Sequence, residues 1–381
     1  MSSILTLNAG SSSLKFALFD AEATPERRAW GQVERIGEDA CLQIEDSGGQ
    51  QDKHHLGDDC SASEALDAVL DALADYDQPD IVGHRIVHGG DDFTQPIQID
   101  HTVLSVLEGL DSLAPLHQPH NLAAVRHFLE NAPDLPQIGV FDTAFHADMP
   151  DVARWIGLPK RFHQRGIRRY GFHGLSYQHA AGEMARLEPA SSRVVVAHLG
   201  NGASLCGIRN GHSVETTMGF SALDGLLMGT RCGRLDPGVL LHLMRVDQMG
   251  LDDLQELLYQ QSGLLGVSGI SHDVRELLAA DNDDARLALE LFVYRVIKET
   301  GALYSVLGGL DALVFTGGIG EHAASIRQAI AAGLAWTGLK LDPQANAGHA
   351  AVLHADSSRL SCRIVRCDEE QVLADACAGM L

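Results

Sequence analysis

Two short segments of the same kind, far apart in the chain, constrain the fold more than any other feature. In the first, an apolar strand runs through Asn8 into a turn at Gly10–Ser13 and leaves the turn as a second strand. In the second, an apolar strand runs through His198 into a turn at Gly200–Gly202. Alignment of Asn8 with His198 places Gly10 on Gly200. A repeated strand–turn–strand unit predicts two similar α/β halves.

The first turn has the chemistry of an anion site. The hydroxyl and backbone N–H groups of Ser11–Ser13 can bind phosphate, and Asn8 and Lys15 add a neutral ligand and a positive charge. Gly10 is expected to supply backbone angles that other residues avoid. One such turn alone is equally well explained as an ordinary serine-rich hairpin, but its second copy favours phosphate binding.

A third glycine segment lies late in the chain. The apolar run 312–315 leads into residues 316–321, TGGIGE, and a helical pattern follows. The chain has no G-x-x-x-x-G-K-[ST] segment, and no G-x-G-x-x-G follows an early strand. Two hairpin turns and a late glycine segment therefore predict a duplicated domain that binds a nucleotide between its halves.

Sequence blocks from one end of the chain to the other resemble a known family. The blocks are LNAGSSSLK at 7–15, GHRIVHGG at 83–90, FDTAFH at 141–146, RRYGFHG at 168–174, HLGNGAS at 198–204, MGTR at 228–231 and FTGGIGE at 315–321. In this order they resemble the acetokinase family of the actin/hexokinase/sugar-kinase superfamily. The resemblance implies a duplicated actin-like (ribonuclease H-like) α/β fold with a nucleotide cleft between two domains. It places residues 1–143 and 369–381 in the first domain and 144–368 in the second.

Local patterns predict individual elements. Expected strands are 4–7, 14–19, 29–34, 41–45, 81–87 and 137–141, and residues 50–60 are expected to form a loop. Expected helices are 61–75, one capped by Asn121, one capped by Ser176, and 285–308 with Leu287, Leu291, Tyr294 and Ile297 on one face.

Composition limits the class of protein. The 28 lysines and arginines against 51 acidic residues give a formal net charge of −23, which disfavours nucleic acid and anionic membranes as partners. The seven cysteines form no C-x-x-C pair, as expected for reduced thiols in a cytoplasmic protein. We see no signal peptide and no apolar run of membrane-spanning length.

The reaction implied by the resemblance is the reversible, direct in-line transfer of a phosphoryl group from ATP to acetate. Arg85 and Arg231 follow apolar stretches in glycine-rich blocks, where guanidinium groups can bind carboxylate and phosphoryl oxygens. A surface ion pair is the ordinary alternative for either arginine alone. The family's catalytic residues match Arg85, Arg231, His173 and Asp142. No general base is expected, because acetate is already an anion at neutral pH.

The resemblance also implies a divalent ion and two binding pockets. Asn8 and Glu369 match the family's ligands for Mg²⁺, for which Mn²⁺ is an alternative, although an acidic first helical turn also explains Glu369. Nucleotide-binding positions are Lys15, Ser11, Ser13, His198, Leu199, Gly200, Asn201, Gly202, Asp273, Val274, Arg275, Gly318, Ile319, Gly320 and His322. His117 matches a further binding position. Many relatives carry asparagine at the position of His322.

The acetate pocket is implied to contain Arg85, Val87, Leu116, Phe172 and Ala222. Many relatives have proline where Ala222 stands, so the preferred acid is the open question, and propionate kinase is the nearest alternative. An actin-fold protein that binds nucleotide as a gate is an alternative of another class. Arg85, His173 and Arg231 disfavour it, because a gate needs no acceptor-side cluster. The resemblance also implies a homodimer.

Overall fold

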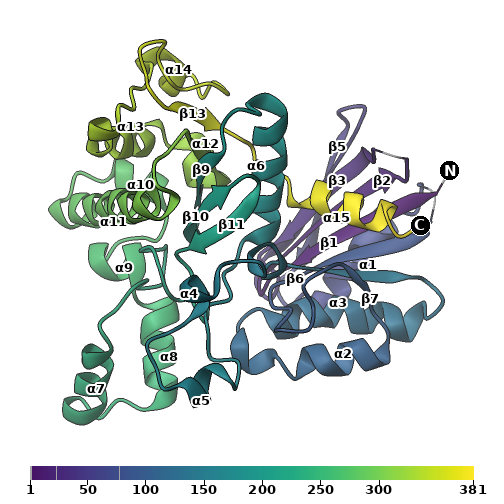
Figure 1. Ribbon diagram of the computed structural model, residues 1–381. Coiled ribbons are helices and arrows are strands. Elements are labelled where there is room, and N and C mark those ends of the chain that lie inside the picture. The colour runs from purple at the N-terminus through teal and green to yellow at the C-terminus, as the bar shows by residue number, and fades with distance from the viewer. Residues whose placement is uncertain (1, 23, 77) are drawn as a thin grey trace. The chain divides into compact units, whose positions relative to one another are not determined.

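The computed structural model describes residues 2–22, 24–76 and 78–381 and divides into two compact units (Figure 1). The first unit comprises Met1–Phe145 and Asp368–Leu381, and the second comprises His146–Cys367. The domain boundaries expected from the sequence lie at residues 143 and 369.

The first unit is built on one sheet with the strand order β5-β4-β3-β2-β1-β6-β8-β7. The strands are β1 Ser3–Ala9, β2 Ser13–Asp20, β3 Glu26–Glu34, β4 Ala40–Asp46, β5 Gln51–Gly57, β6 Ile81–Ile86, β7 Ile97–Gln98 and β8 Gln137–Phe141. The first five strands form an antiparallel meander. On the other side of β1, β6 pairs parallel to β1 and β8 pairs parallel to β6. The edge strand β7 pairs antiparallel to β8.

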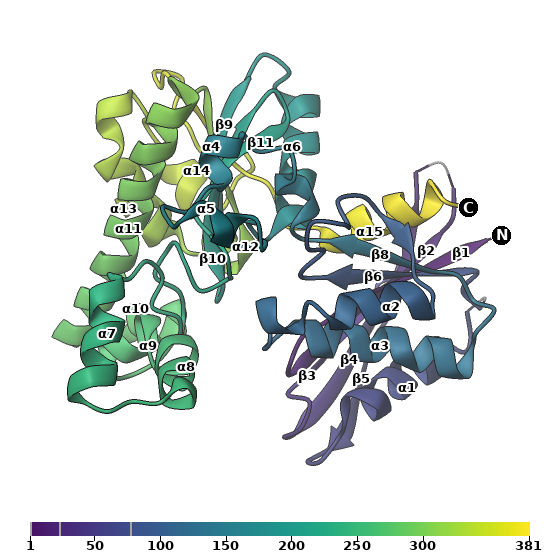
Figure 2. The same ribbon diagram turned by 60° about the horizontal axis from the view of Figure 1, so that its bottom comes forward.

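Helices cover both faces of this sheet (Figure 2). They are α1 Ala62–Ala72, α2 His101–Glu108, α3 Gln118–Asn131 and α15 Glu369–Ala378, with the short 3₁₀ turns η1 Asp111–Leu113 and η2 Ala144–His146. On one face, Phe16 of β2 packs with Leu66 of α1 and Phe128 of α3 in a buried core. On the other face, α15 packs on β1 and β6, so the end of the chain completes the first unit.

The second unit has a five-stranded sheet with the order β11-β10-β9-β12-β13. Its strands are β9 Arg193–Leu199, β10 Ala203–Arg209, β11 His212–Thr216, β12 Ala312–Thr316 and β13 Ser361–Ile364. Its helices are α4 Asp151–Arg154, α5 Lys160–His163, α6 Gly174–Leu187, α7 Pro237–Val246, α8 Leu251–Gln260, α9 Gly263–Ser268, α10 Val274–Ala279, α11 Asp283–Leu307, α12 Gly317–His322, α13 Ala324–Gly333 and α14 Pro343–Ala347, with the 3₁₀ turn η3 Ala335–Thr337.

The two sheets share one topology. In each, an antiparallel hairpin is followed by two strands that run parallel to its first strand: β1, β6 and β8 in the first unit, and β9, β12 and β13 in the second. Asn8 and His198 are both the next-to-last residue of the first strand. The duplication inferred from the two turns is therefore present in the backbone.

Three expectations for the first unit are wrong. Residues 50–60 are not a loop, because β5 occupies Gln51–Gly57 as an exposed edge strand with a polar sequence. Asn121 does not cap α3; the helix begins at Gln118, and the Asn121 side chain accepts a hydrogen bond from Val87 N. Gly10 is not among the glycines with positive φ, but a Cβ at this position would lie 3.3 Å from Ser13 Oγ.

Two expectations for the second unit are wrong as well. Ser176 lies inside α6 rather than at its cap, and the capping position belongs to His173. In α11, Leu287 and Tyr294 of the predicted face are 55% and 60% exposed, and Ala288, Phe292 and Val296 are buried instead. Apolar residues surround this helix on more than one side, because α9, α13 and β10 all pack against it.

The long helix α11 is nonetheless found within two residues of its predicted range, and Ser61 caps α1 with a complete capping box. The seven cysteines are present as thiols and not as disulfides. Among the helices of the described residues, none combines the length and apolar character needed to cross a bilayer.

Candidate active-site residues of the two units

The carboxyl ends of three neighbouring parallel strands bring charged side chains together in the first unit. Asn8 is the next-to-last residue of β1, Arg85 is the next-to-last residue of β6, and Asp142 directly follows β8. Because parallel strands end at the same edge of a sheet, these side chains meet there, and this edge is where open α/β sheets place their ligands.

Arg85 and Asp142 form a two-pronged ion pair at this edge. Arg85 Nε donates to Asp142 Oδ1 at 3.1 Å, and Nη2 donates to Oδ2 at 2.6 Å. The Asp142 side chain is only 1% exposed and that of Arg85 17%. The pair therefore has the fork geometry that fixes a guanidinium in one orientation.

Asn8 and Glu369 lie on the other side of the same guanidinium. Arg85 Nη1 is 3.1 Å from Asn8 Oδ1 and 3.2 Å from Glu369 Oε2, and Asn8 Nδ2 donates to that carboxylate oxygen at 3.0 Å. Glu369 is the first residue of α15, so this helix places a carboxylate beside β1. An amide oxygen and a carboxylate oxygen side by side are the hard donors that Mg²⁺ prefers.

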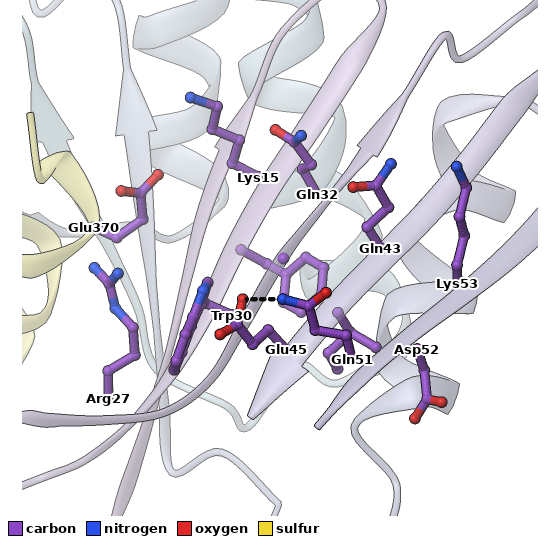
Figure 3. A pocket seen from close by; sticks show the side chains of 13 residues that line it. Lys15, Arg27, Trp30, Gln32, Gln43, Glu45, Gln51, Asp52, Lys53 and Glu370 are labelled. Carbon is purple, nitrogen blue, oxygen red and sulfur yellow. Dashed lines mark hydrogen bonds between the residues drawn. The ribbon is translucent and has the colours of Figure 1, made fainter. Parts of the chain in front are cut away.

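Lys15 lies on a polar groove of the same unit (Figure 3). A cross-strand row runs from Lys15 through Gln32 and Gln43 to Lys53, one residue from each strand of the β2–β5 meander. Glu370 of α15 closes the groove near Lys15, and its burial and the neighbouring Glu369 raise the pKa of its carboxyl. Of the predicted turn residues, Ser11 is exposed and Ser13 half-buried.

In the second unit, His173 and His198 form a stacked pair. Their ring centroids are 4.3 Å apart, with 28° between the planes. His173 precedes α6 in a left-handed conformation with φ 59°, directly after Phe172 and Gly171. Gly171 also has positive φ, and a Cβ there would lie 2.6 Å from the His146 ring, so only glycine fits.

The second hairpin turn lies beside this pair and beside Arg231. A methyl group at Gly202 would be 3.3 Å from His173 Nε2 and 3.9 Å from Arg231 Nη1. Gly229 N donates to Asn201 O at 2.9 Å, which holds the loop carrying Arg231 against the turn. Arg231 Nη1 donates to Ala222 O at 3.1 Å, and burial lowers the pKa of the guanidinium from its usual high value, although an arginine stays protonated.

The late glycine segment is mostly the helix α12 rather than a loop. Gly317 has φ 77°, and a Cβ there would lie 2.9 Å from Leu199 O, so the helix starts against the end of β9. Glu321 Oε1 accepts hydrogen bonds from Gly317 N and Cys367 N, both at 2.9 Å. Within α12, Gly318 and His322 are exposed, Ile319 is half-buried and Gly320 is buried.

The remaining predicted residues lie as follows. Asp273 caps α10 and forms a two-pronged pair with Arg275, whose side chain is 89% exposed. This pairing lowers the pKa of the Asp273 carboxyl.

Val274 is buried at 3% exposure. The acetate-pocket residues Val87 and Leu116 belong to the first unit, and Phe172 and Ala222 to the second; Val87 and Phe172 are buried, the other two half-buried. His117 occupies the capping position of α3.

Comparison with known proteins decides the family. The model of the acetokinase family matches residues 3–375. The chain belongs to the acetokinase family. It is 47% identical to an acetate kinase of Rhodopseudomonas palustris over 384 aligned residues, covering 97% of this chain and 96% of that protein. It is 45% identical to an acetate kinase of Nitrobacter hamburgensis, with coverage of 100% and 96%.

Solved structures of a propionate kinase and of an acetate kinase confirm the fold. A propionate kinase from Francisella tularensis superposes with a TM-score of 0.92 at 35% identity, covering 99% of each chain. Porphyromonas gingivalis acetate kinase superposes with a TM-score of 0.87 at 35% identity, covering 98% of each. The expected α/β class and duplicated actin-like fold are therefore confirmed.

Sequence reasoning missed several residues that support the candidate site. Arg327 of α13 is fully buried and donates to Gly320 O at 2.9 Å and Glu321 O at 2.8 Å, at the carboxyl end of α12. Ser204 and Tyr177 contact each other beside His173, and neither was given a role. A lone arginine, serine or tyrosine carries no local pattern, so no sequence signal could have found them without the fold.

Proposed function

We propose that this protein catalyses the reversible ATP-dependent phosphorylation of acetate to acetyl phosphate. The observation that carries the proposal is that the family's reactive residue types stand at the matching positions and are held in place within their units. Arg85 is fixed by Asp142, and Arg231 and His173 border one glycine turn. Direct phosphoryl transfer needs this kind of fixed positive charge more than it needs covalent catalysis.

Each residue has a defined part in this proposal. Arg231 and the Nε2 side of His173 bind phosphoryl oxygens, while the turn 200–202 and the start of α12 supply backbone N–H groups to the nucleotide phosphates. Arg85 binds the carboxylate or the transferring group, and Asp142 orients it. Asn8 and Glu369 would hold a divalent ion, which supplies positive charge to phosphate oxygens when bound.

Product trapping tests the proposal directly. The purified protein, ATP, Mg²⁺ and acetate are incubated with hydroxylamine, which converts an acyl phosphate into a coloured hydroxamate. We expect hydroxamate that depends on ATP, on acetate and on the divalent ion. Absence of hydroxamate from acetate, propionate and butyrate alike would refute the carboxylate-kinase function and would favour the nucleotide-gate alternative.

The metal-ligand role of Asn8 predicts a changed metal requirement. Asn8→Ala removes the amide that lies 3.0 Å from Glu369 and should raise the concentration of Mg²⁺ needed for half-maximal activity. An outer-sphere or ligand change of this kind typically costs about 10–100-fold in metal affinity. Activity is titrated with Mg²⁺ and with Mn²⁺ at fixed total ATP. A titration that matches the unchanged protein would remove Asn8 from the metal site.

The preferred acid is proposed to be acetate, with propionate as the alternative that Ala222 favours. A methyl group is smaller than a proline ring, so the pocket has more room for the extra methylene of propionate. One methylene in an apolar pocket is worth about 1–3 kcal/mol. We therefore expect Ala222→Pro to shift the ratio of kcat/KM for acetate over propionate upward, by up to roughly 10–200-fold. Both acids are assayed with both proteins, and an unchanged ratio would show that position 222 does not set specificity.

Self-association and location are the remaining parts of the proposal. Helix α7 has no buried residue, and its Leu241, Met244 and Val246 are 63%, 52% and 59% exposed. An apolar surface of this kind usually marks an interface, and we propose that it contributes to a homodimer. Cysteines present as thiols rather than as disulfides support a cytoplasmic protein.

A further inference from the structure

In the second unit, each of the two stacked histidines contacts a serine from another secondary-structure element. His173 stands at the start of α6, and its Nδ1 lies 2.8 Å from Ser204 Oγ on β10. His198 stands on β9, and its Nδ1 lies 2.8 Å from Ser176 Oγ on α6. The contacts are reciprocal, because α6 with its capping residue supplies His173 and Ser176, and the β9–β10 hairpin supplies His198 and Ser204. This arrangement fixes the orientation of both rings and the face that each presents.

Each serine oxygen also has a second hydrogen-bonding neighbour. The hydroxyl of Tyr177, a residue with 0% exposure, is 2.5 Å from Ser204 Oγ. The thiol of Cys367 donates to Ser176 Oγ at 3.6 Å. A buried phenol O–H needs an acceptor, and Ser204 Oγ is one within reach. When a serine oxygen accepts from the phenol or the thiol, its own single proton is directed to the imidazole.

The direction of these hydrogen bonds fixes the tautomer of each ring. An imidazole Nδ1 that accepts a proton from serine must, in the neutral ring, carry its hydrogen on Nε2. Both Nε2 atoms lie at the glycine turn of the hairpin. A methyl group at Gly202 would be 3.3 Å from His173 Nε2, and one at Gly200 would be 3.9 Å from His198 Nε2.

We propose that Ser204 and Ser176 are positioning residues that hold His173 and His198 as the tautomers protonated on Nε2, so that both rings direct an N–H to an anionic phosphate group at the turn 200–202. Tyr177 sets the direction of the hydrogen bond from Ser204 to His173. Cys367 sets the direction of the hydrogen bond from Ser176 to His198. His198 thereby becomes a second neutral donor to phosphate beside His173. The inference deepens the proposed phosphoryl-transfer function and rests on it for its catalytic consequence.

The tautomers are measured by NMR without any turnover. Protein labelled with ¹⁵N at histidine is recorded in long-range ¹H–¹⁵N correlation spectra, about two pH units above the reference imidazole pKa of about 6.5. His173→Gln and His198→Gln identify the two ring systems among the 19 histidines. We expect the Nε2–H pattern at both rings. In Ser204→Ala the preference should be lost at His173 and kept at His198, and in Ser176→Ala the reverse.

Kinetics test the consequence for catalysis. Ser204→Ala should lower kcat by roughly 10–100-fold, the range for removing the partner that orients a functional histidine. The KM for acetate should stay within about twofold, because neither serine belongs to the proposed acid pocket. Tyr177→Phe should reproduce part of the loss. Thr300→Val serves as the control, because it also removes a fully buried hydroxyl of the second unit, in α11, and should leave kcat unchanged.

The outcomes separate this inference from the proposed function. A wild-type spectrum with Nδ1–H at either ring, or one that neither serine variant changes, would overturn the inference whatever the activity. A kcat of Ser204→Ala equal to that of Thr300→Val would overturn its catalytic part. Absence of acyl phosphate from the unchanged protein would instead overturn the proposed function, and the tautomers would still be measured.

Discussion

Replacing Arg231 with alanine is expected to lower kcat by roughly two to four orders of magnitude, the scale for losing a preorganised charge that contacts the transition state. Arg231 is half-buried, its Nη1 donates to Ala222 O at 3.1 Å, and it borders the same glycine turn as His173 Nε2. Initial rates at saturating ATP and acetate measure the effect. The kcat of Arg231→Lys should lie between those of the unchanged protein and Arg231→Ala, because lysine keeps the positive charge but lacks the planar guanidinium.

Fold integrity must be checked alongside this loss. Arg231 Nη1 donates to the backbone oxygen of Ala222, and we expect Arg231→Ala to leave the far-UV circular dichroism and the urea midpoint close to those of the unchanged protein. Turnover of Arg231→Ala within tenfold of normal would contradict its role in the transition state. A collapsed spectrum would assign the loss to folding, and Arg231→Lys then decides between the two.

Replacing Arg85 with alanine should affect both activity and stability. A kcat loss of similar size to that of Arg231→Ala is expected from the missing charge. In addition, Asp142 is 1% exposed and would be left as a buried carboxylate without its two-pronged partner. Breaking a buried pair in this way costs roughly 3 kcal/mol or more. The loss of Arg85 is therefore expected to lower stability as well as activity.

A double variant separates the two effects of Arg85. Arg85→Ala with Asp142→Ala should be more stable than Arg85→Ala alone, because the double variant no longer contains the buried Asp142 carboxylate without its partner, while the contact of Glu369 with Arg85 is lost in both variants. Unfolding is followed by tryptophan fluorescence in a Trp155→Phe, Trp336→Phe background, which leaves Trp30 as the reporter of the first unit. The two replaced tryptophans are 42% and 63% exposed, so their loss should cost little. Equal stability of the single and double variants would refute the buried-charge explanation.

The sequence predicted those structural features that depend on residues close together in the chain. The two glycine turns, the alternation of strands and helices, and the strand at Gln137–Phe141 depend on residues close together in the chain, and the structure contains all of them. The repeated turn also predicted the duplicated topology, because strand order follows from chain connectivity once two equivalent hairpins are recognised.

The failures have physical causes that lie outside local pattern. The polar run Gln51–His55 gave no apolar alternation, yet an edge strand of an antiparallel meander needs none when its faces are exposed. In α11, the buried face was set by three packing partners that the sequence could not place. Ser176 has a good capping residue type, but its hydroxyl serves His198 instead.

The contacts that define the candidate site join residues that are far apart in sequence. The Arg85–Asp142 pair spans 57 positions and the His173–Ser204 contact spans 31. Resemblance to a family identified Arg85, Asp142 and His173, but not the hydrogen bonds that orient them. Those bonds depend on which strand ends are neighbours, and only the folded sheet determines this.

The hydrogen bond between Asn8 and Glu369 joins positions 361 residues apart. A ribosome adds the second of these residues 361 positions after the first, when much of the chain between them has already had time to fold. The oxygen pair proposed to bind the metal ion therefore does not exist in a nascent chain that has not yet reached Glu369. An unfinished protein can fold its second unit around the stacked histidines while it still lacks this part of the first. A product truncated before α15 should therefore lack the proposed metal-binding pair, and we expect it not to consume ATP.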